Sequence, residues 1–151
     1  MAEMTLPMEG GCRCGKLRFR ISAPPMLTMA CHCTGCQKMS ASAYSLSVAV
    51  PSDGFEVIQG EPVIGGLHGD QSRHHHCDWC KSWVFTRLPP ELGFVNVRAT
   101  MLDDTHGFAP FVETYRSEAF PWAATSAKHS YDAFPDMADY PKLLAEFARG
   151  G

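Results

Sequence analysis

The sequence predicts a mainly all-β domain that ends in a short helix. Apolar and polar residues alternate along several short stretches, which is the pattern of strands with one buried face. The 13 glycines and 11 prolines among 151 residues favour many turns and short strands over a helical bundle. Apolar residues at helical spacing occur near the C-terminus, where Leu143, Leu144 and Phe147 precede Gly150.

The individual elements follow from these patterns. The first strand is clear because Leu17, Phe19 and Ile21 alternate with basic residues until Pro24 and Pro25 end it. The glycine-rich residues 60–69 are expected to link two strands loosely. Further strands are expected over residues 27–30, 44–50, 55–58, 83–85, 94–99 and 111–115, and a helix over residues 142–149.

Length and charge limit the classes of protein to consider. We expect residues 1–9 to be a flexible tail and residues 10–151 to form one domain with its own core. The formal charge of −3 does not predict a basic surface for nucleic acid. No apolar run approaches the roughly 18 residues of a membrane span, and the N-terminus lacks a signal pattern. We therefore expect a cytoplasmic protein with reduced cysteines and with neither a membrane nor a nucleic-acid partner.

The seven cysteines are the main functional signal. They occur as Cys12 and Cys14, then Cys31, Cys33 and Cys36, then Cys77 and Cys80. Their number is odd, and cysteines two residues apart are poorly placed to bridge each other, so metal ligation is favoured over disulfides. Zinc is the expected metal, because it binds thiolates in a tetrahedron.

The spacing divides these cysteines into two groups. Two pairs from distant parts of the chain can complete a closed structural zinc site, the four-cysteine group of Cys12, Cys14, Cys77 and Cys80. The remaining three-cysteine group of Cys31, Cys33 and Cys36 leaves one coordination position for water, a histidine or a substrate atom. A second zinc is expected there, bound less tightly than in the closed site. Alternatively, these three thiols bind nothing and simply lie in a turn.

The charges near the cysteines favour thiolates. Residues 10–52 contain no acidic side chain but include Arg13 and Lys38, which flank the cysteines. Cations beside a thiolate lower its pKa. Lys16, Arg18 and Arg20 are better explained as the solvated face of a strand.

Together these motifs resemble the glutathione-dependent formaldehyde-activating enzyme family, which also includes centromere protein V-like members. The resemblance rests on residues 10–15 (GGCRCG), 31–38 (CHCTGCQK), 77–80 (CDWC), 97–104 (VRATMLDD) and 121–122 (PW). It implies an Mss4-like fold of zinc-stapled β-sheets and the same two ligand sets. It also implies a carbon–sulfur lyase activity, the condensation of glutathione with formaldehyde to S-hydroxymethylglutathione. Lys81 and Trp83 depart from the Gly and Pro that the family usually shows there.

A mechanism follows for the open site. A small thiol such as glutathione would occupy the free position on the zinc of the three-cysteine group and attack formaldehyde or a related small carbonyl. His32 is a candidate to protonate the nascent alkoxide, and Lys38 is the second candidate catalytic residue. The tryptophans Trp79, Trp83 and Trp122 are expected in the core or in a pocket wall.

Two other classes of function remain open. One is a non-catalytic zinc-stapled binding or scaffold domain of the same family, for which a basic or proline-rich extension would be typical. The other is a thiol-based redox or metal-storage protein, which is disfavoured because the four-cysteine group looks committed to structure.

Overall fold

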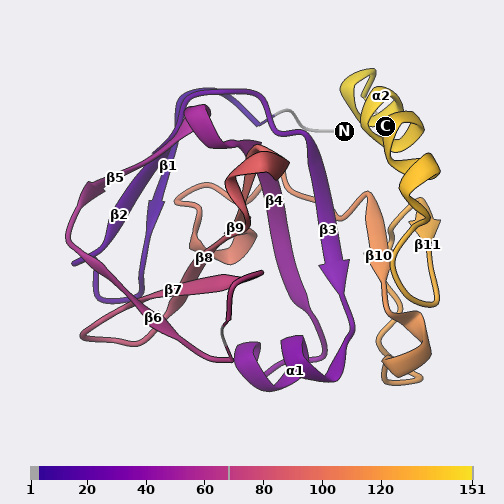
Figure 1. Ribbon diagram of the computed structural model, residues 1–151, viewed down its shortest axis with the longest axis horizontal. Helices are drawn as coiled ribbons and strands as arrows, with labels where there is room; N and C mark the ends of the chain where they lie inside the picture. The colour runs from indigo at the N-terminus through magenta and orange to yellow at the C-terminus, as the bar shows by residue number, and fades with distance from the viewer. Residues whose placement is uncertain (1–3, 68, 151) are drawn as a thin grey trace.

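The computed structural model describes residues 4–67 and 69–150, and it is built mainly from β-strands with a C-terminal helix (Figure 1). The mainly all-β prediction is therefore confirmed. The strands form a three-stranded sheet in the order β1-β2-β5 and an eight-stranded sheet in the order β11-β10-β3-β4-β9-β8-β7-β6. The strands are β1 (Met8–Gly11), β2 (Arg18–Ile21), β3 (Leu27–Cys31), β4 (Ser45–Pro51), β5 (Phe55–Gln59), β6 (Pro62–Gly65), β7 (Arg73–Cys77), β8 (Trp83–Arg87), β9 (Phe94–Arg98), β10 (Val112–Thr114) and β11 (His129–Ser130).

Two α-helices accompany the sheets. Helix α1 (Thr34–Ser40) follows β3, and helix α2 (Tyr140–Ala148) covers the end of the large sheet where β3, β10 and β11 lie (Figure 1). Short 3-10 helices occur at Ser52–Gly54, Pro90–Leu92, Ala99–Met101, Arg116–Glu118 and Met137–Asp139. The predicted C-terminal helix is thus present and begins two residues earlier than expected.

The small sheet has the alternation that the sequence predicts. Phe19 and Ile21 of β2 are fully buried, and the Phe19 ring packs against Phe55 of β5 at 5.6 Å between centroids. Strand β1 begins at Met8, inside the segment expected as a tail, and Met8 pairs with Ile21. Its buried side chain explains why the strand starts there. Residues 1–3 of that segment lie outside the described residues.

The large sheet is antiparallel from β3 to β6, and β10 joins β3 in parallel. Fully buried valines of β4 and β9, such as Val48 and Val97, share a core with the small sheet. A second cluster lies under α2, where Leu143 packs with Leu27 and Phe111. Strands β3, β4 and β9 thus lie in the middle of the large sheet, and α1 lies against β4 (Figure 1).

Strand β6 and helix α1 are among the elements that were not expected. Strand β6 lies within the glycine-rich residues 60–69 and pairs with β7, with Val63 opposite His76. Helix α1 starts directly after Cys33, which caps it by accepting a hydrogen bond from the Cys36 amide at 3.3 Å. Glycines hide the first pattern, and a seven-residue helix is too short to show helical periodicity in the sequence.

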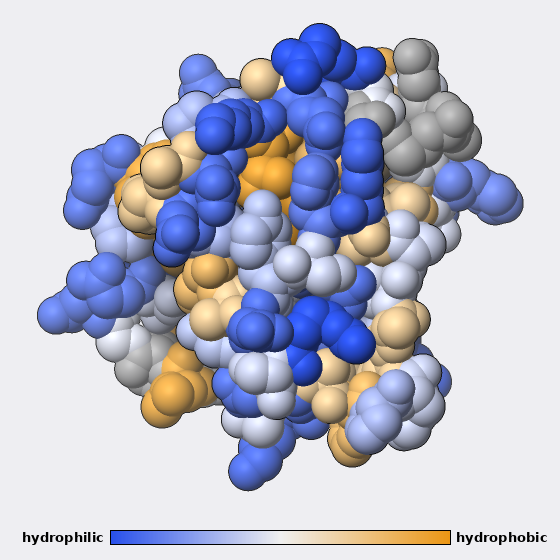
Figure 2. All heavy atoms as spheres, turned by 90° about the vertical axis from the view of Figure 1, so that its right-hand side faces the viewer, coloured by the Kyte–Doolittle hydropathy of each residue, from blue (hydrophilic) through white to orange (hydrophobic). Residues whose placement is uncertain are grey.

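The surface on the side of β10, β11 and α2 is mostly hydrophilic, with separate hydrophobic patches between polar side chains (Figure 2). Trp122 is 75% exposed and Trp79 is 72% exposed, so neither lies in the core, although Trp79 lines a pocket with Lys16 and Asp78, which agrees with the expected pocket wall. Within residues 4–67 and 69–150, no helix combines the length and apolar character that crossing a membrane requires.

Candidate metal centres

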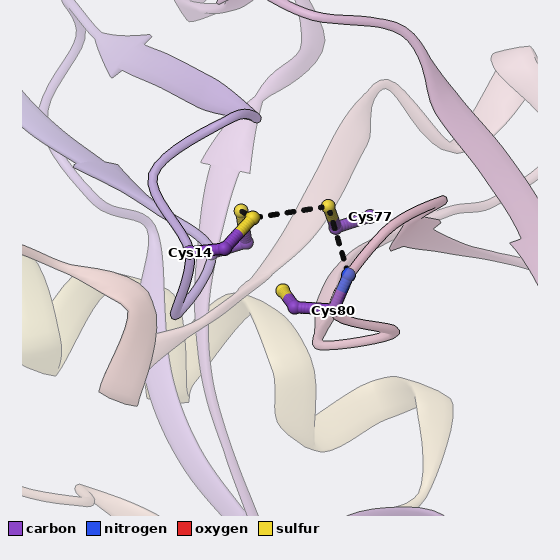
Figure 3. A group of neighbouring side chains, drawn as sticks. Cys14, Cys77 and Cys80 are labelled. Atoms are coloured by element: carbon purple, nitrogen blue, oxygen red, sulfur yellow. Dashed lines mark hydrogen bonds between the residues drawn. The ribbon is translucent and has the colours of Figure 1, made fainter.

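The four-cysteine group connects the two sheets. Cys12 and Cys14 lie in the turn between β1 and β2, and Cys77 and Cys80 lie at the turn between β7 and β8. The four sulfurs all lie within 4.8 Å of one another. The Sγ atom of Cys14 is 3.5 Å from that of Cys12 and 3.7 Å from that of Cys77. Figure 3 shows Cys14 facing Cys77 and Cys80 across the gap between their turns. All seven cysteines are free of disulfides.

Backbone amides hold these sulfurs in place. The Leu17 amide donates to Cys12 Sγ at 3.3 Å, and the Cys80 amide donates to Cys77 Sγ at 3.5 Å. The second turn closes through the Lys81 amide, which donates to the Cys77 carbonyl at 3.0 Å. Lys81 takes a positive φ of 61° to do so, a conformation that glycine adopts more easily.

The thiols of the four-cysteine group differ in pKa. Desolvation acts to raise the pKa of Cys80. The hydrogen bonds with the hydroxyl and amide of Ser82, together with other neighbours, outweigh this effect and lower the pKa to about 5. The Lys16 amide lowers the pKa of Cys14, but desolvation and the other sulfurs raise it to about 11. Without a cation, the group therefore keeps protons on some of its sulfurs, which a bound metal ion would displace.

The three-cysteine group lies where β3 turns into α1. Cys31 is the last residue of β3, Cys33 caps α1, and Cys36 lies in its first turn. Their sulfurs also lie within 4.8 Å of one another. A hydrogen bond from Cys36, together with those from Thr114 and Cys33, outweighs burial and lowers the pKa of Cys31 to about 5. The same contact with Cys31 raises the pKa of Cys36.

A cavity of about 320 Å³ adjoins the three-cysteine group through neighbouring residues, although none of the three cysteines is among its lining residues. Ser40 connects the two, because its hydroxyl donates to the Cys36 carbonyl at 2.7 Å. Ser45 does so as well, since it pairs with Cys31 across β3 and β4. Hydroxyl-bearing, basic and apolar side chains line the cavity: Met39, Ser40, Ser42, Tyr44, Ser45, Leu46, Lys81, Ser82, Trp83, Arg98, Thr100 and Met101.

Arg98 at the end of β9 is a site residue that sequence reasoning missed. Its side chain lines the cavity, yet the residue is only 7% exposed. The guanidinium carbon lies 4.1 Å from the centroid of the Trp83 ring, and Nε is buried without a hydrogen-bond partner. Burial lowers the pKa of Arg98 to about 10, while Cys36 and Cys31 act in the opposite direction, so the side chain stays charged at neutral pH. Trp83 is buried and lines the same cavity, as expected.

The two residues expected to be catalytic lie in different surroundings. His32 is fully buried, and its Nε2 atom lies 2.8 Å from Glu113 Oε1 on β10. Lys38 is exposed in the last turn of α1 and is not part of the cavity lining. Residues His74, His75 and His76 lie in β7, and both groups of potential ligands found within the described residues consist of cysteines alone.

Comparison with known proteins assigns the chain to a family. The family model for "Glutathione-dependent formaldehyde-activating enzyme" matches residues 7–118. A Halomonas elongata protein named "Putative glutathione-dependent formaldehyde-activating enzyme" is 34% identical over 95 residues. That match covers 56% of this chain and 60% of the relative, so it spans less than two thirds of the relative's length.

A solved structure has a similar fold. The crystal structure of a Rhodobacter sphaeroides protein matches with a TM-score of 0.53 at 15% identity, covering 64% of this chain and 88% of that one. At this identity the likeness shows the fold alone. The family match covers both cysteine groups, Arg98 and His32, so the site lies within the matched residues. The chain belongs to the glutathione-dependent formaldehyde-activating enzyme family.

Proposed function

We propose that the protein is a zinc-dependent enzyme of the carbon–sulfur lyase type that condenses glutathione, or a similar small thiol, with formaldehyde or a related small carbonyl. One observation carries this proposal beyond family membership. Three sulfurs gather at the end of β3, next to a cavity of about 320 Å³ that can admit a small ligand.

The donor atoms of both groups suit zinc. Two sulfurs bound to one tetrahedral zinc at about 2.3 Å are about 3.8 Å apart. The distances of 3.5 and 3.7 Å from Cys14 to Cys12 and Cys77 are close to that value. We therefore assign the structural zinc to the four-cysteine group and a second zinc to the three-cysteine group. When bound to three cysteines, zinc supplies a free coordination position and lowers the pKa of a thiol that occupies it.

The reaction is a simple addition. The sulfur of the thiol forms a bond to the carbonyl carbon, the carbonyl π pair moves to oxygen, and the proton lost by the thiol ends on that oxygen. No oxidant or reductant is needed. The chain contributes mainly by holding the thiol beside the carbonyl, because formaldehyde is reactive and proximity supplies most of the acceleration. The hydroxyls of Ser45 and Tyr44 in the cavity wall can hydrogen-bond the developing alkoxide, whereas the Ser40 hydroxyl already donates to the Cys36 carbonyl.

The buried His32 is best explained as a positioning residue. Its ring joins the cysteine turn to Glu113, and Glu113 also accepts hydrogen bonds from Thr125 and Ser130, each at 3.0 Å. This network fixes the segment between Cys31 and Cys33 against β10 and β11. The ring of Tyr44, which is one of the cavity-lining residues, lies against the His32 ring edge to face, with 5.1 Å between the centroids. Lys38 would act on the cysteines only through its long-range field.

The test is the rate at which the thiol and the carbonyl combine. Exchange NMR with ¹³C-formaldehyde and glutathione measures this rate above the uncatalysed background. We expect acceleration by the zinc-loaded protein and loss of acceleration in Cys33→Ser. The control is Lys142→Gln, a change at an exposed residue of α2 that leaves every cysteine in place, and it should keep the full acceleration. No acceleration by the zinc-loaded parent would refute the proposal and leave the zinc-stapled scaffold as the function.

A further inference from the structure

We propose that Arg98 is a specificity-determining residue that binds a carboxylate of the ligand in the cavity beside the three-cysteine group. The proposal rests on the proposed function in one respect: that function is the reason for taking the ligand to be a thiol. The anion site itself depends only on the geometry of the cavity.

Strand register places Arg98 on the same face of the large sheet as Cys31. Cys31 on β3 lies opposite Ser45 on β4, and Ser47 on β4 lies opposite Arg98 on β9. Ser45 and Ser47 are two residues apart, so their side chains project to one face. Cys31 and Arg98 therefore project to that face from strands about 10 Å apart. A ligand whose sulfur lies at the cysteines can extend across β4 and place a second group near Arg98.

Among the described residues, no carboxylate pairs with the Arg98 guanidinium, and the opposite charges that act on it are those of Cys36 and Cys31. Within residues 4–67 and 69–150, no ion pair or hydrogen bond of its side chain is found, and Nε is buried without a partner. The arginines of β2 differ, since Arg18 is paired with Asp103 and Arg20 with Glu9. A buried cation without a partner is costly, and the Trp83 ring offsets only part of that cost. A carboxylate entering the cavity would supply the missing hydrogen bonds, and arginine binds carboxylates with two parallel N–H donors.

The rest of the cavity suits an anionic and polar ligand. Its lining contains no acidic side chain, and the second basic residue of the wall, Lys81, is already paired with Asp78 at 2.9 Å, which leaves Arg98 as the cation without a carboxylate among the lining residues. Ser42, Ser82 and Thr100 contribute hydroxyls that can hydrogen-bond amides or carboxylates. The volume of about 320 Å³ lies at the lower end of the range for small-molecule sites. The ligand class that fits is a small thiol that carries at least one carboxylate.

A different role for Arg98 makes a different prediction. The cysteine sulfurs attract its charge, so it could serve only to offset thiolates. In that case replacing Arg98 would weaken metal binding, and it would affect charged and uncharged ligands alike. A carboxylate partner instead predicts that Arg98 discriminates between ligands by their charge.

The experiment uses S-methylglutathione and its dimethyl ester as probes. Their blocked sulfur cannot react, so binding is measured by calorimetry independently of any activity. We expect the zinc-loaded parent to bind the acid at least about tenfold more tightly than the ester. Arg98→Gln should bind the two probes equally, Arg98→Lys should retain part of the preference, and the control Lys142→Gln, an exposed residue of α2 away from the cavity, should match the parent.

Each outcome decides for or against the inference. Equal affinity of the parent for both probes would overturn it without any variant. Loss of zinc from Arg98→Gln, or an equal fall in affinity for both probes, would overturn it in favour of thiolate compensation. If Arg98→Gln does not fold, the parent and Arg98→Lys still provide the comparison. Retained preference for the acid in a protein that fails to accelerate the reaction would uphold the anion site and reject the proposed function.

Discussion

Replacing Cys77 by serine should remove a large part of the protein's free energy of unfolding, because this residue helps to connect the two sheets. Cys14 and Cys77 are 63 positions apart and their sulfurs lie 3.7 Å from each other. In the unfolded chain, bringing them to one ion closes a loop of that length, at a cost of about 4 kcal/mol. The folded chain already holds the four sulfurs together, so zinc binds it preferentially and stabilises it by at least that difference.

This loss is large for a domain of this size. Typical free energies of unfolding are about 5–15 kcal/mol, so Cys77→Ser should lose a large part of the total. With a slope of about 2 kcal/mol per molar urea, the midpoint of unfolding should fall by about 2 M. The assay is urea unfolding followed by tryptophan fluorescence, with zinc present and again with excess chelator. Chelator should bring the parent close to the variant.

The matched control is Cys33→Ser in the three-cysteine group. Its ligands lie within six consecutive residues, so an ion there adds little loop closure. Serine is also a good helix cap and can replace the sulfur that accepts from the Cys36 amide. We expect a loss below about 1 kcal/mol. A larger loss in Cys33→Ser than in Cys77→Ser would refute the assignment of the structural site.

Three further predictions follow. Cys33→Ser should abolish the acceleration of glutathione addition to formaldehyde while its circular dichroism spectrum stays that of the parent. Lys81→Gly should raise the free energy of unfolding by up to about 1 kcal/mol, since φ is 61° there; a fall in the urea midpoint would contradict this. Glu146→Gln should lower the urea midpoint at pH 7, because Glu146 accepts from His129 at 2.6 Å and joins α2 to β11. That hydrogen bond to His129 lowers the pKa of Glu146 below 4.5, so the stability it adds is present above pH 4.5 and is lost as the pH falls through the folded pKa. The gap between parent and variant should therefore close in urea titrations at lower pH, and a gap that widens would contradict the assignment.

Much of the fold could be predicted because side-chain alternation reports which face of a strand is buried. The alternation around Phe19 and Ile21 is such a case, and both side chains are fully buried in β2. Strand β6 could not be found in this way, because its exposed and half-buried residues Pro62–Gly65 carry no alternating pattern. The parallel pairing of β10 with β3 depends on contacts between Val112 and Met29, far apart in the chain, so no local pattern reveals it.

The site was only partly predictable for a similar reason. Cysteine spacing is a local signal, and the groups it predicts are the ones that the structure brings together. Arg98 was missed because a charged residue at the end of a strand usually faces solvent. Only the packing of Trp83 over it, and its position above the middle of the large sheet, bury it beside the cavity. His32 looked available for proton transfer in the sequence, but the Glu113 side chain from β10 encloses it.

The most direct test of the central claim is a competitive chelator titration that measures the affinity of each zinc ion, with and without glutathione. The claim is that four cysteines close one site while three leave the other open to a thiol. It predicts two zinc ions per chain, of which the weaker is bound at least about tenfold more tightly when glutathione is present, while the affinity of the stronger is unchanged. Glutathione that leaves both affinities unchanged, or that strengthens the site lost in Cys77→Ser, would contradict it.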